Sequence, residues 1–402
     1  MSAIGGIVDF KNKEVDFSEL NALRRSMSLR GRCGSSAYLC GGAGMIFNSS
    51  EQIEGDGLRQ PNIEDRRGKS VALCIDSHGI SPRAVSEKYL VHGTDFLGCI
   101  DGAFALSLYD EERDTLILAR DRCGKKPLFY SVANGKIYFA SEPKGIIDAQ
   151  GETLNVNRDI LEYHLVGPMG IYRASSIYPD VCEVLAGECV AFTAFGISKF
   201  FYRKNREASR IKEKKAEKFT KERIISLYPS FEREKLSDYL NEALIAFDYP
   251  QFDCYMPFLS EVLSKASALG KESVMFEDIV RRKNLVYARE REDRLGALYG
   301  IRAIGTFTPS QPTFGEGCME ALLRLLNERF FSIPPYDRIL LREIFGQYKL
   351  DYLLEILSMP TKKEDTEKKI RILGMLCQTV EWMQARDLRF VSHSREYSAY
   401  SV

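Results

Sequence analysis

A strand–turn–strand pattern at residues 102–119 constrains the fold of this chain more than any other feature of its sequence. Residues 102–109 form a mainly apolar run, and residues 115–119 form a second one after the charged segment 110–114. Short apolar runs that are bounded by a turn are typical of buried strands. The pattern therefore predicts an antiparallel hairpin.

A second hairpin is predicted directly downstream. Residues 127–130 and 136–140 flank Asn134 and Gly135, a dipeptide that supplies the positive φ angles of a tight hairpin turn. The strands of both hairpins are apolar on both faces, which is typical of strands that lie between two layers. The first half of the chain therefore favours a layered sandwich.

The second half is predicted to be mainly helical. Apolar residues recur there at helical spacing, in the segments 236–247, 319–326, 338–346 and 367–388. The stretch that joins the halves, 203–225, is densely charged and predicts a solvated linker or an exposed helix, with an anion-binding strip of lysines as the alternative. These patterns indicate an α+β protein with domains at 1–202 and 226–402.

The composition restricts the possible partners and compartment. The 402 residues include 56 basic and 56 acidic side chains, so no global charge favours nucleic acid or an anionic membrane. No run reaches the length of about 18 apolar residues that a spanning helix needs, and the N-terminus does not look like an export signal. We therefore expect a cytoplasmic protein that binds neither nucleic acid nor membrane.

The cysteines and histidines do not form a recognisable framework. The ten cysteines include no C-x-x-C pair, and the four histidines, His78, His92, His164 and His393, are dispersed. This spacing argues against a disulfide framework and against a zinc site. Most of the cysteines are expected to be small core residues.

Three motifs resemble the N-terminal glutaminase domain of the asparagine synthetase family. Residues 101–105, 119–130 and 140–146 are similar to its D-G-x-F-A, R-D-x-x-G-x-x-P-L and S-E-x-K series, in the same order. The resemblance continues through 185–188, where such domains have a P-G-H turn, and it covers residues 1–202. It implies an α-β-β-α sandwich of the N-terminal nucleophile (Ntn) hydrolase type.

A weaker resemblance follows downstream. Residues 291–302 are similar to the D-R-x-S-M-A-x-x-x-E-x-R segment of the family's synthetase domain, and 339–345 to its L-R-E-x-F helix. Because the intervening segments are much shorter here, the resemblance implies a mostly helical, truncated remnant of the ATP-using domain.

The nucleophile position differs from the family pattern. Family members begin M-C-G-I, whereas this chain begins with Met1, Ser2, Ala3 and Ile4. A thiolate attacks amides well, while a hydroxyl needs an adjacent base. Ser2 is thus the candidate catalytic residue by position, and an ordinary second residue is the other interpretation.

The set of residues that binds glutamine in the family is incomplete in this chain. Of the family's R-G-P-D loop, Arg30 and Gly31 remain as candidate substrate-binding residues, but Arg32 and Cys33 follow them. The N-G-E strand end falls near 73–77, where the asparagine is missing, and the S-D-x-E turn is absent between Ser86 and Phe96. Loss of one oxyanion-hole donor alone raises the barrier by about 3 to 4 kcal/mol.

The nucleotide loops are missing as well. The family's S-G-G-x-D-S loop corresponds to residues 251–260, which contain no glycine and include Pro257. A second loop corresponds to 273–278, where only the acidic pair Glu277 and Asp278 persists. Asp253 with these acids or Asp293 could be drawn as a metal site, but solvated or helix-capping acids are the favoured interpretation, and no metal or other cofactor is predicted.

Three functions remain open. The first is a non-catalytic binding or regulatory subunit that acts through a protein partner or as a homo-oligomer. The second is an ATP- and Mg-dependent amide ligase, using glutamine or ammonia, whose nucleotide site a partner chain completes. The third is a hydrolase with Ser2 as nucleophile, which requires removal of Met1.

Overall fold

The computed structural model describes most of the N-terminal half and the principal helices of the C-terminal half. The described residues are 2–50, 60–66, 69–151, 154–166, 177–202, 211–212, 235–245, 252, 256–270, 273–275, 294–304, 318–361, 365–384 and 388–391. Most of the charged stretch 203–225 lies outside them, so its prediction as a linker or helix is untested there. Its two described residues form the short strand β15 (Ile211–Lys212), which pairs with β6 (Ile100–Asp101). Within these ranges, no helix has the length and hydropathy needed to cross a membrane.

The chain divides into two compact units that are not contiguous in sequence. The first comprises Met1–Glu152, Asp180–Phe219 and Gly296–Arg302, and the rest forms the second. The sequence suggested a single boundary after residue 202, but Thr153–Pro179 belongs to the second unit. In that unit, α4 (Arg158–Val166) packs against α12 and α13, and β11 (Leu154–Asn157) pairs with β18 (Leu388–Val391).

The first unit contains two antiparallel six-stranded sheets. One has the order β12-β9-β10-β1-β3-β2, with bounds β12 Cys182–Glu183, β9 Phe129–Ala133, β10 Lys136–Ala140, β1 Ala3–Val8, β3 Ala43–Ser49 and β2 Gly34–Cys40. The other has the order β14-β13-β8-β7-β5-β4, with bounds β14 Gly196–Phe201, β13 Glu188–Thr193, β8 Thr115–Arg120, β7 Phe104–Asp110, β5 Lys69–Ser77 and β4 Asn62–Arg66.

Both predicted hairpins are confirmed. Strands β7 and β8 pair up to Asp110 opposite Thr115, and nearly all of their residues are buried. Strands β9 and β10 are joined by Asn134 and Gly135, with φ angles of 53° and 76°. Two successive positive φ angles give the turn a twist that matches that of the strands.

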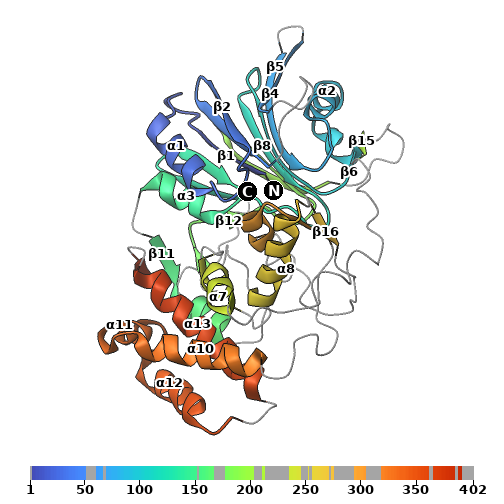
Figure 1. Cartoon of the computed structure of the whole chain (residues 1–402). Coiled ribbons are helices and arrows are strands. Elements are labelled where there is room, and N and C mark those ends of the chain that lie inside the picture. The colour runs from blue at the N-terminus through green and yellow to red at the C-terminus, as the bar shows by residue number, and fades with distance from the viewer. Residues whose placement is uncertain are drawn as a thin grey trace. The chain divides into compact units, whose positions relative to one another are not determined.

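Helices cover the outer faces of both sheets. α1 (Phe17–Ser26) and α3 (Pro143–Gln150) contact the sheet of β1, while α2 (Pro82–His92) contacts β4 and β5 of the other sheet and is followed by the 3-10 helix Gly93–Cys99 (Figure 1). Apolar side chains fill the space between the sheets and also the space under α2. The α-β-β-α sandwich that the resemblance implied is thus confirmed.

The period of two along β5 separates these cores. Ala72 and Cys74 contribute to the core between the sheets, whereas Leu73 and Ile75 pack under α2. Alternate side chains of a strand point to opposite faces. Asp76, the next residue, therefore faces the space between the sheets.

The second unit is mainly helical, as predicted. Its longer helices are α7 Leu236–Ile245, α8 Met256–Ala268, α10 Cys318–Ser332, α12 Leu341–Ser358 and α13 Thr366–Gln384, with the short α11 Pro335–Ile339 before α12. Arg329 of α10 donates two hydrogen bonds to Glu381 of α13, at 2.7 and 2.8 Å. Two strands, β16 (Ser273–Met275) and β17 (Arg302–Ile304), form a small separate pair.

One predicted helix end coincides with a break in the structure, and another is wrong. The helix expected to end at Gly346 is interrupted there, because Gly346 has a non-helical φ of 67°, and a second helical segment follows up to Ser358 within α12. Arg158 donates a hydrogen bond of 3.1 Å to the carbonyl of Ile344 just before this break. The helix expected to reach residue 388 ends at Gln384, and Leu388 begins strand β18 because it pairs with β11, a segment far away in the sequence.

Candidate functional site

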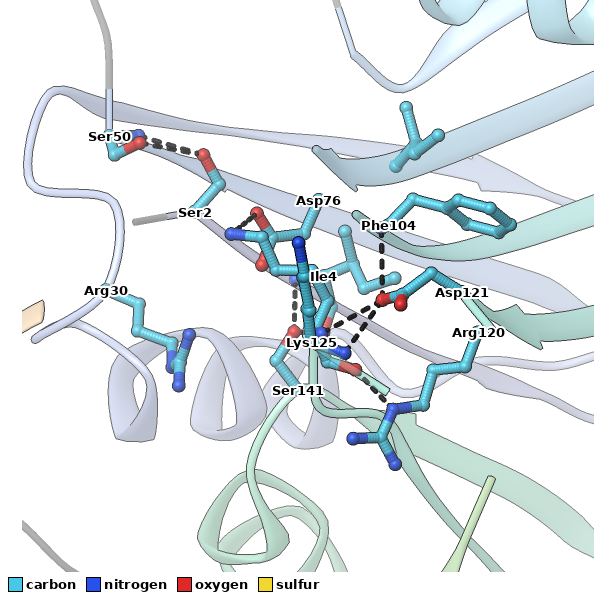
Figure 2. A network of polar contacts seen from close by, with 12 residues as sticks. Ser2, Ile4, Arg30, Ser50, Asp76, Phe104, Arg120, Asp121, Lys125 and Ser141 are labelled. Carbon is cyan, nitrogen blue, oxygen red and sulfur yellow. Dashed lines mark hydrogen bonds and ion pairs between the residues drawn. The ribbon is translucent and has the colours of Figure 1, made fainter. Parts of the chain in front are cut away.

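Ser2 lies where the resemblance places a nucleophile, directly before β1. Two residues later, Ile4 belongs to the core between the sheets, so Ser2 is on the same face of its strand. The residue is 8% exposed. Its Oγ lies 3.1 Å from Ser50 Oγ and accepts a hydrogen bond of 3.2 Å from the backbone N–H of Ser50 (Figure 2).

The S-E-x-K segment fixes the start of β1. The backbone N–H of Ile4 donates to Ser141 Oγ at 3.0 Å, and the N–H of Ser141 donates to the carbonyl of Ile4 at 2.9 Å. These bonds hold the first residues of β1 against the end of β10. The position of Ser2 is therefore set by backbone pairing and by a buried serine.

Arg30 is placed deep in the first unit. Its side chain is 0% exposed, and its Nε donates to Glu142 Oε1 at 2.7 Å. Glu142 is also ion-paired through Oε2 with Lys144, at 2.8 Å. The proposed role of Arg30 in binding a substrate remains a prediction, but its guanidinium already bonds a buried carboxylate.

The backbone conformation at position 31 and its close approach to Asn48 both require glycine. It has a φ of 71°, and a Cβ built on it would lie 2.2 Å from the carbonyl carbon of Asn48 and 2.3 Å from its oxygen. Asn48 is fixed in turn, because its Nδ2 donates to the carbonyls of Arg24 and Met27. Gly31 thus allows the loop after α1 to lie close to β3.

We predict that Gly31→Ala lowers the free energy of unfolding by about 2 to 3 kcal/mol. The left-handed conformation costs a residue with a Cβ about 1 to 2 kcal/mol, and the contact with Asn48 adds strain. Chemical denaturation of both proteins gives the difference. Gly135→Ala is a matched control, since its φ is 76° but no atom lies within 4 Å of its Cβ, so it should show the conformational cost only.

The R-D pair of the second motif organises the loop after β8. The carboxylate of Asp121 accepts backbone hydrogen bonds from Phe104, Cys123, Lys125 and Lys126, at 2.9 to 3.3 Å. Arg120 donates to the carbonyls of Gly124, Lys126 and Val184 and to Glu183 Oε1. In this chain the retained motif has a structural role.

Asp76 and Lys126 meet between the sheets. Lys126 Nζ lies 3.1 Å from Asp76 Oδ1, and the side chains are 13% and 1% exposed. Figure 2 shows Asp76 and Ser2 at the same end of the sandwich. Lys126 was not singled out from the sequence, because 50 residues separate it from Asp76 and no spacing rule connects them.

Four of the eight cysteines whose burial the structure describes behave as core residues, which is fewer than the majority that was predicted. Cys74, Cys99, Cys189 and Cys377 are buried, Cys40 is half-buried, and Cys33, Cys123 and Cys182 are exposed; all eight are free thiols. Burial raises the pKa of the Cys189 and Cys377 thiols to about 12. Thiols with such a raised pKa are poor nucleophiles.

The segment compared with the first phosphate loop forms a buried helix start. Met256, Pro257 and Phe258 open α8 and are buried, and Pro257 is placed where a helix tolerates a missing N–H. The second compared segment begins with strand β16. Asp253, Glu277, Asp278 and Asp293 lie outside the described residues, and no cluster of metal-ligating side chains occurs within them.

Comparisons with known proteins agree with the motifs. A glutamine amidotransferase domain family matches residues 83–203. Asparagine synthetase (glutamine-hydrolyzing) 3 of Bacillus subtilis (strain 168) is 24% identical over 226 residues, which cover 50% of this chain and 36% of that protein. Asparagine synthetase B (glutamine-hydrolyzing) of Escherichia coli (strain K12) is 26% identical over 166 residues, or 37% of this chain and 30% of that protein.

The matched part is limited in length. The chain spans about a third of the length of these two relatives. Among solved structures, the glutamine phosphoribosylpyrophosphate amidotransferase of B. subtilis aligns with 77% of this chain and 69% of its own, at 14% identity and a TM-score of 0.34. The family match, the two synthetase relatives and the ordered motifs together relate the N-terminal part of this chain to the glutamine amidotransferase domains of the asparagine synthetase family.

Proposed function

We propose that the chain is a non-catalytic relative of these amidotransferases, and that it acts as a binding or regulatory subunit through a protein partner or a second copy of itself. The observation that carries this proposal is the environment of Ser2. Its Oγ is hydrogen-bonded to Ser50, through both the hydroxyl and the backbone N–H of that residue. Neither group is a base that would take the proton of a serine nucleophile at neutral pH, and the α-amino group of Ser2 could do so only after removal of Met1.

The charged groups near Ser2 support the same proposal. Arg30 bonds Glu142, and Asp76 bonds Lys126, so both ionic groups have partners within the chain. An amino acid substrate would have to displace Glu142 and Lys126 before the Arg30 guanidinium and the Asp76 carboxylate could bind its charged groups. Displacing a buried pair leaves an uncompensated charge, which is strongly unfavourable.

A glutaminase assay on two proteins tests the proposal. Wild-type protein, with its N-terminus defined by intact mass, is expected to release no glutamate from glutamine above a no-protein blank. The variant Ser2→Cys is expected to remain inactive too, although it restores the thiol of the family. Glutamine hydrolysis by the wild type would contradict the proposal.

Activity of Ser2→Cys without activity of the wild type would lead to a separate conclusion about the pocket. If the variant, but not the wild type, hydrolyses glutamine, the pocket is competent and the nucleophile is the sole defect. Ser50→Ala is a useful companion, because it removes the hydroxyl partner of Ser2 but keeps the backbone donor. It too is expected to be inactive.

The alternative function, an ATP-dependent amide ligase, requires a nucleotide site from a partner chain. The buried apolar start of α8 does not resemble a phosphate cradle, which exposes backbone N–H groups. A thermal-shift titration with ATP and Mg²⁺ discriminates the two functions. We expect no shift for the isolated chain, whereas a saturable rise in melting temperature would favour the ligase.

A further inference from the structure

The carboxylate of Asp76 is an unusual group in the first unit, because it is almost completely removed from solvent. It stands at the end of β5 opposite Ala105, a residue of the core between the sheets. A buried carboxylate is unfavourable unless a counter-charge and hydrogen bonds compensate it. Lys126 supplies the counter-charge to Oδ1, at 3.1 Å.

The second carboxylate oxygen is left without a comparable contact. Asp76 Oδ2 is buried and has no hydrogen-bond partner among the residues that the structure describes. Buried polar atoms in folded proteins are nearly always hydrogen-bonded, so an exception calls for a functional or ligand-based explanation. The carboxylate therefore retains capacity for a further N–H donor.

The backbone of Lys126 is held firmly, while its side chain reaches Asp76. Its backbone N–H donates to Asp121 Oδ2 at 3.2 Å, and its carbonyl accepts a hydrogen bond from Arg120 Nε. The loop thus fixes the Cα, and the flexible four-carbon stem delivers the ammonium. If the Lys126 side chain alone moved, the contact between its Nζ and Asp76 Oδ1 would be lost while the loop stayed folded.

We propose that Asp76 forms a binding site for a primary ammonium group, and that Lys126 is its internal occupant and excludes amine ligands from outside. This inference rests on the proposed non-catalytic function. It describes how the Asp76 carboxylate is kept from binding amines in solution. An external amine gains both carboxylate oxygens only after the lysine has left. Small molecules with a primary ammonium are the class of ligand that the site would take.

Competition with a tethered group determines the expected affinity. A group on a short flexible tether acts at an effective concentration in the millimolar range or higher. An external amine must exceed this value to displace Lys126 in the wild type. Removal of the lysine side chain should therefore strengthen amine binding by about tenfold or more.

The variant Lys126→Ala with n-propylammonium chloride provides the test. Truncation at Cβ removes three carbons and the ammonium, which is the shape of n-propylammonium. We expect a saturable rise in the melting temperature of the variant, relative to sodium chloride at equal ionic strength. The wild type should show no such rise over the same concentrations.

Two variants serve as controls. Asp76→Asn/Lys126→Ala lacks the charge of the carboxylate and is expected not to respond. Lys136→Ala removes a more exposed ammonium, which pairs with Glu19 at 3.0 Å with exposures of 19% and 25%, and it should respond no more than the wild type. A rise of equal size in either control would overturn the proposal.

The proposal can still be tested if the variant Lys126→Ala fails to fold. If Lys126→Ala does not fold in sodium chloride, its refolding yield is compared with and without n-propylammonium, and no gain in yield would overturn the proposal. Failure of the rescue leaves the glutaminase result unaffected. Glutamine hydrolysis by the wild type would instead contradict the proposed function, whatever the outcome of the rescue.

Discussion

Replacing Arg30 by methionine is expected to lower the free energy of unfolding by about 3 to 5 kcal/mol. The guanidinium is 0% exposed, and its bond to Glu142 is 2.7 Å long. Removing one member of a buried ion pair leaves the other charge without full compensation in a region of low dielectric constant. Lys144 stays beside Glu142 and limits the loss, so we expect a value toward the lower end.

A double variant separates charge from packing. In Arg30→Met/Glu142→Leu both charges are absent, and apolar replacement of a buried pair is often close to neutral. We therefore expect this protein to be more stable than Arg30→Met alone. Denaturant unfolding of the four proteins of the cycle gives the coupling energy. Additive losses would show that the contact at 2.7 Å contributes little.

A surface pair provides the reference for this cycle. Arg83 is 59% exposed and lies 3.4 Å from Glu87, one helical turn later in α2, and 3.3 Å from Glu64 of β4. Exposed pairs of this kind contribute about 0.3 to 0.5 kcal/mol. Arg83→Met should thus change stability far less than Arg30→Met.

Replacing Asp121 by alanine is expected to destabilise the protein by about 3 to 4 kcal/mol. Its carboxylate accepts four backbone hydrogen bonds, and three of them end at Oδ2. Bonds to charged groups contribute about 1.5 to 3 kcal/mol each, although such contributions are not additive, and water can replace the acceptor for the exposed donors. The N–H of Phe104 is the donor most affected, because that residue is 1% exposed.

Asp121→Asn is the matched control for this variant. Its one carbonyl oxygen can keep the three bonds made by Oδ2, but its amide group cannot accept from Cys123. The expected order of stability is wild type, then Asp121→Asn, then Asp121→Ala. Equal stability of the wild type and Asp121→Ala, measured by chemical denaturation, would rule out a structural role for the motif.

The local elements of this fold were accessible from the sequence. The turns at 110–114 and at Asn134 and Gly135 fixed two hairpins, because turn chemistry and apolar runs act over a few residues. Helices such as α10 were likewise evident from their spacing. The helical segment that follows the break at Gly346 was missed. Strand β18 was missed too, since it depends on pairing with β11, a segment far away in the sequence.

The candidate site was only partly accessible. Ser2, Arg30 and Gly31 were found from their positions in motifs, and the structure places Ser2 between the sheets and Arg30 against Glu142. Lys126 lies within the motif 119–130, but the motif does not indicate that its side chain contacts Asp76. Asp76 comes from strand β5, and no short spacing connects the two residues.

The sequence by itself determined the hairpins, the helical character of the second half and the absence of a cysteine at position 2, because these follow from residue identity and from short-range periodicity. Only the tertiary structure decided which charges meet. Arg30 with Glu142 and Asp76 with Lys126 are joined across 112 and 50 residues. Such pairs form when packing brings strands and loops together. Because the pair is buried, the loss of either residue leaves the charge of the other without compensation, which is unfavourable.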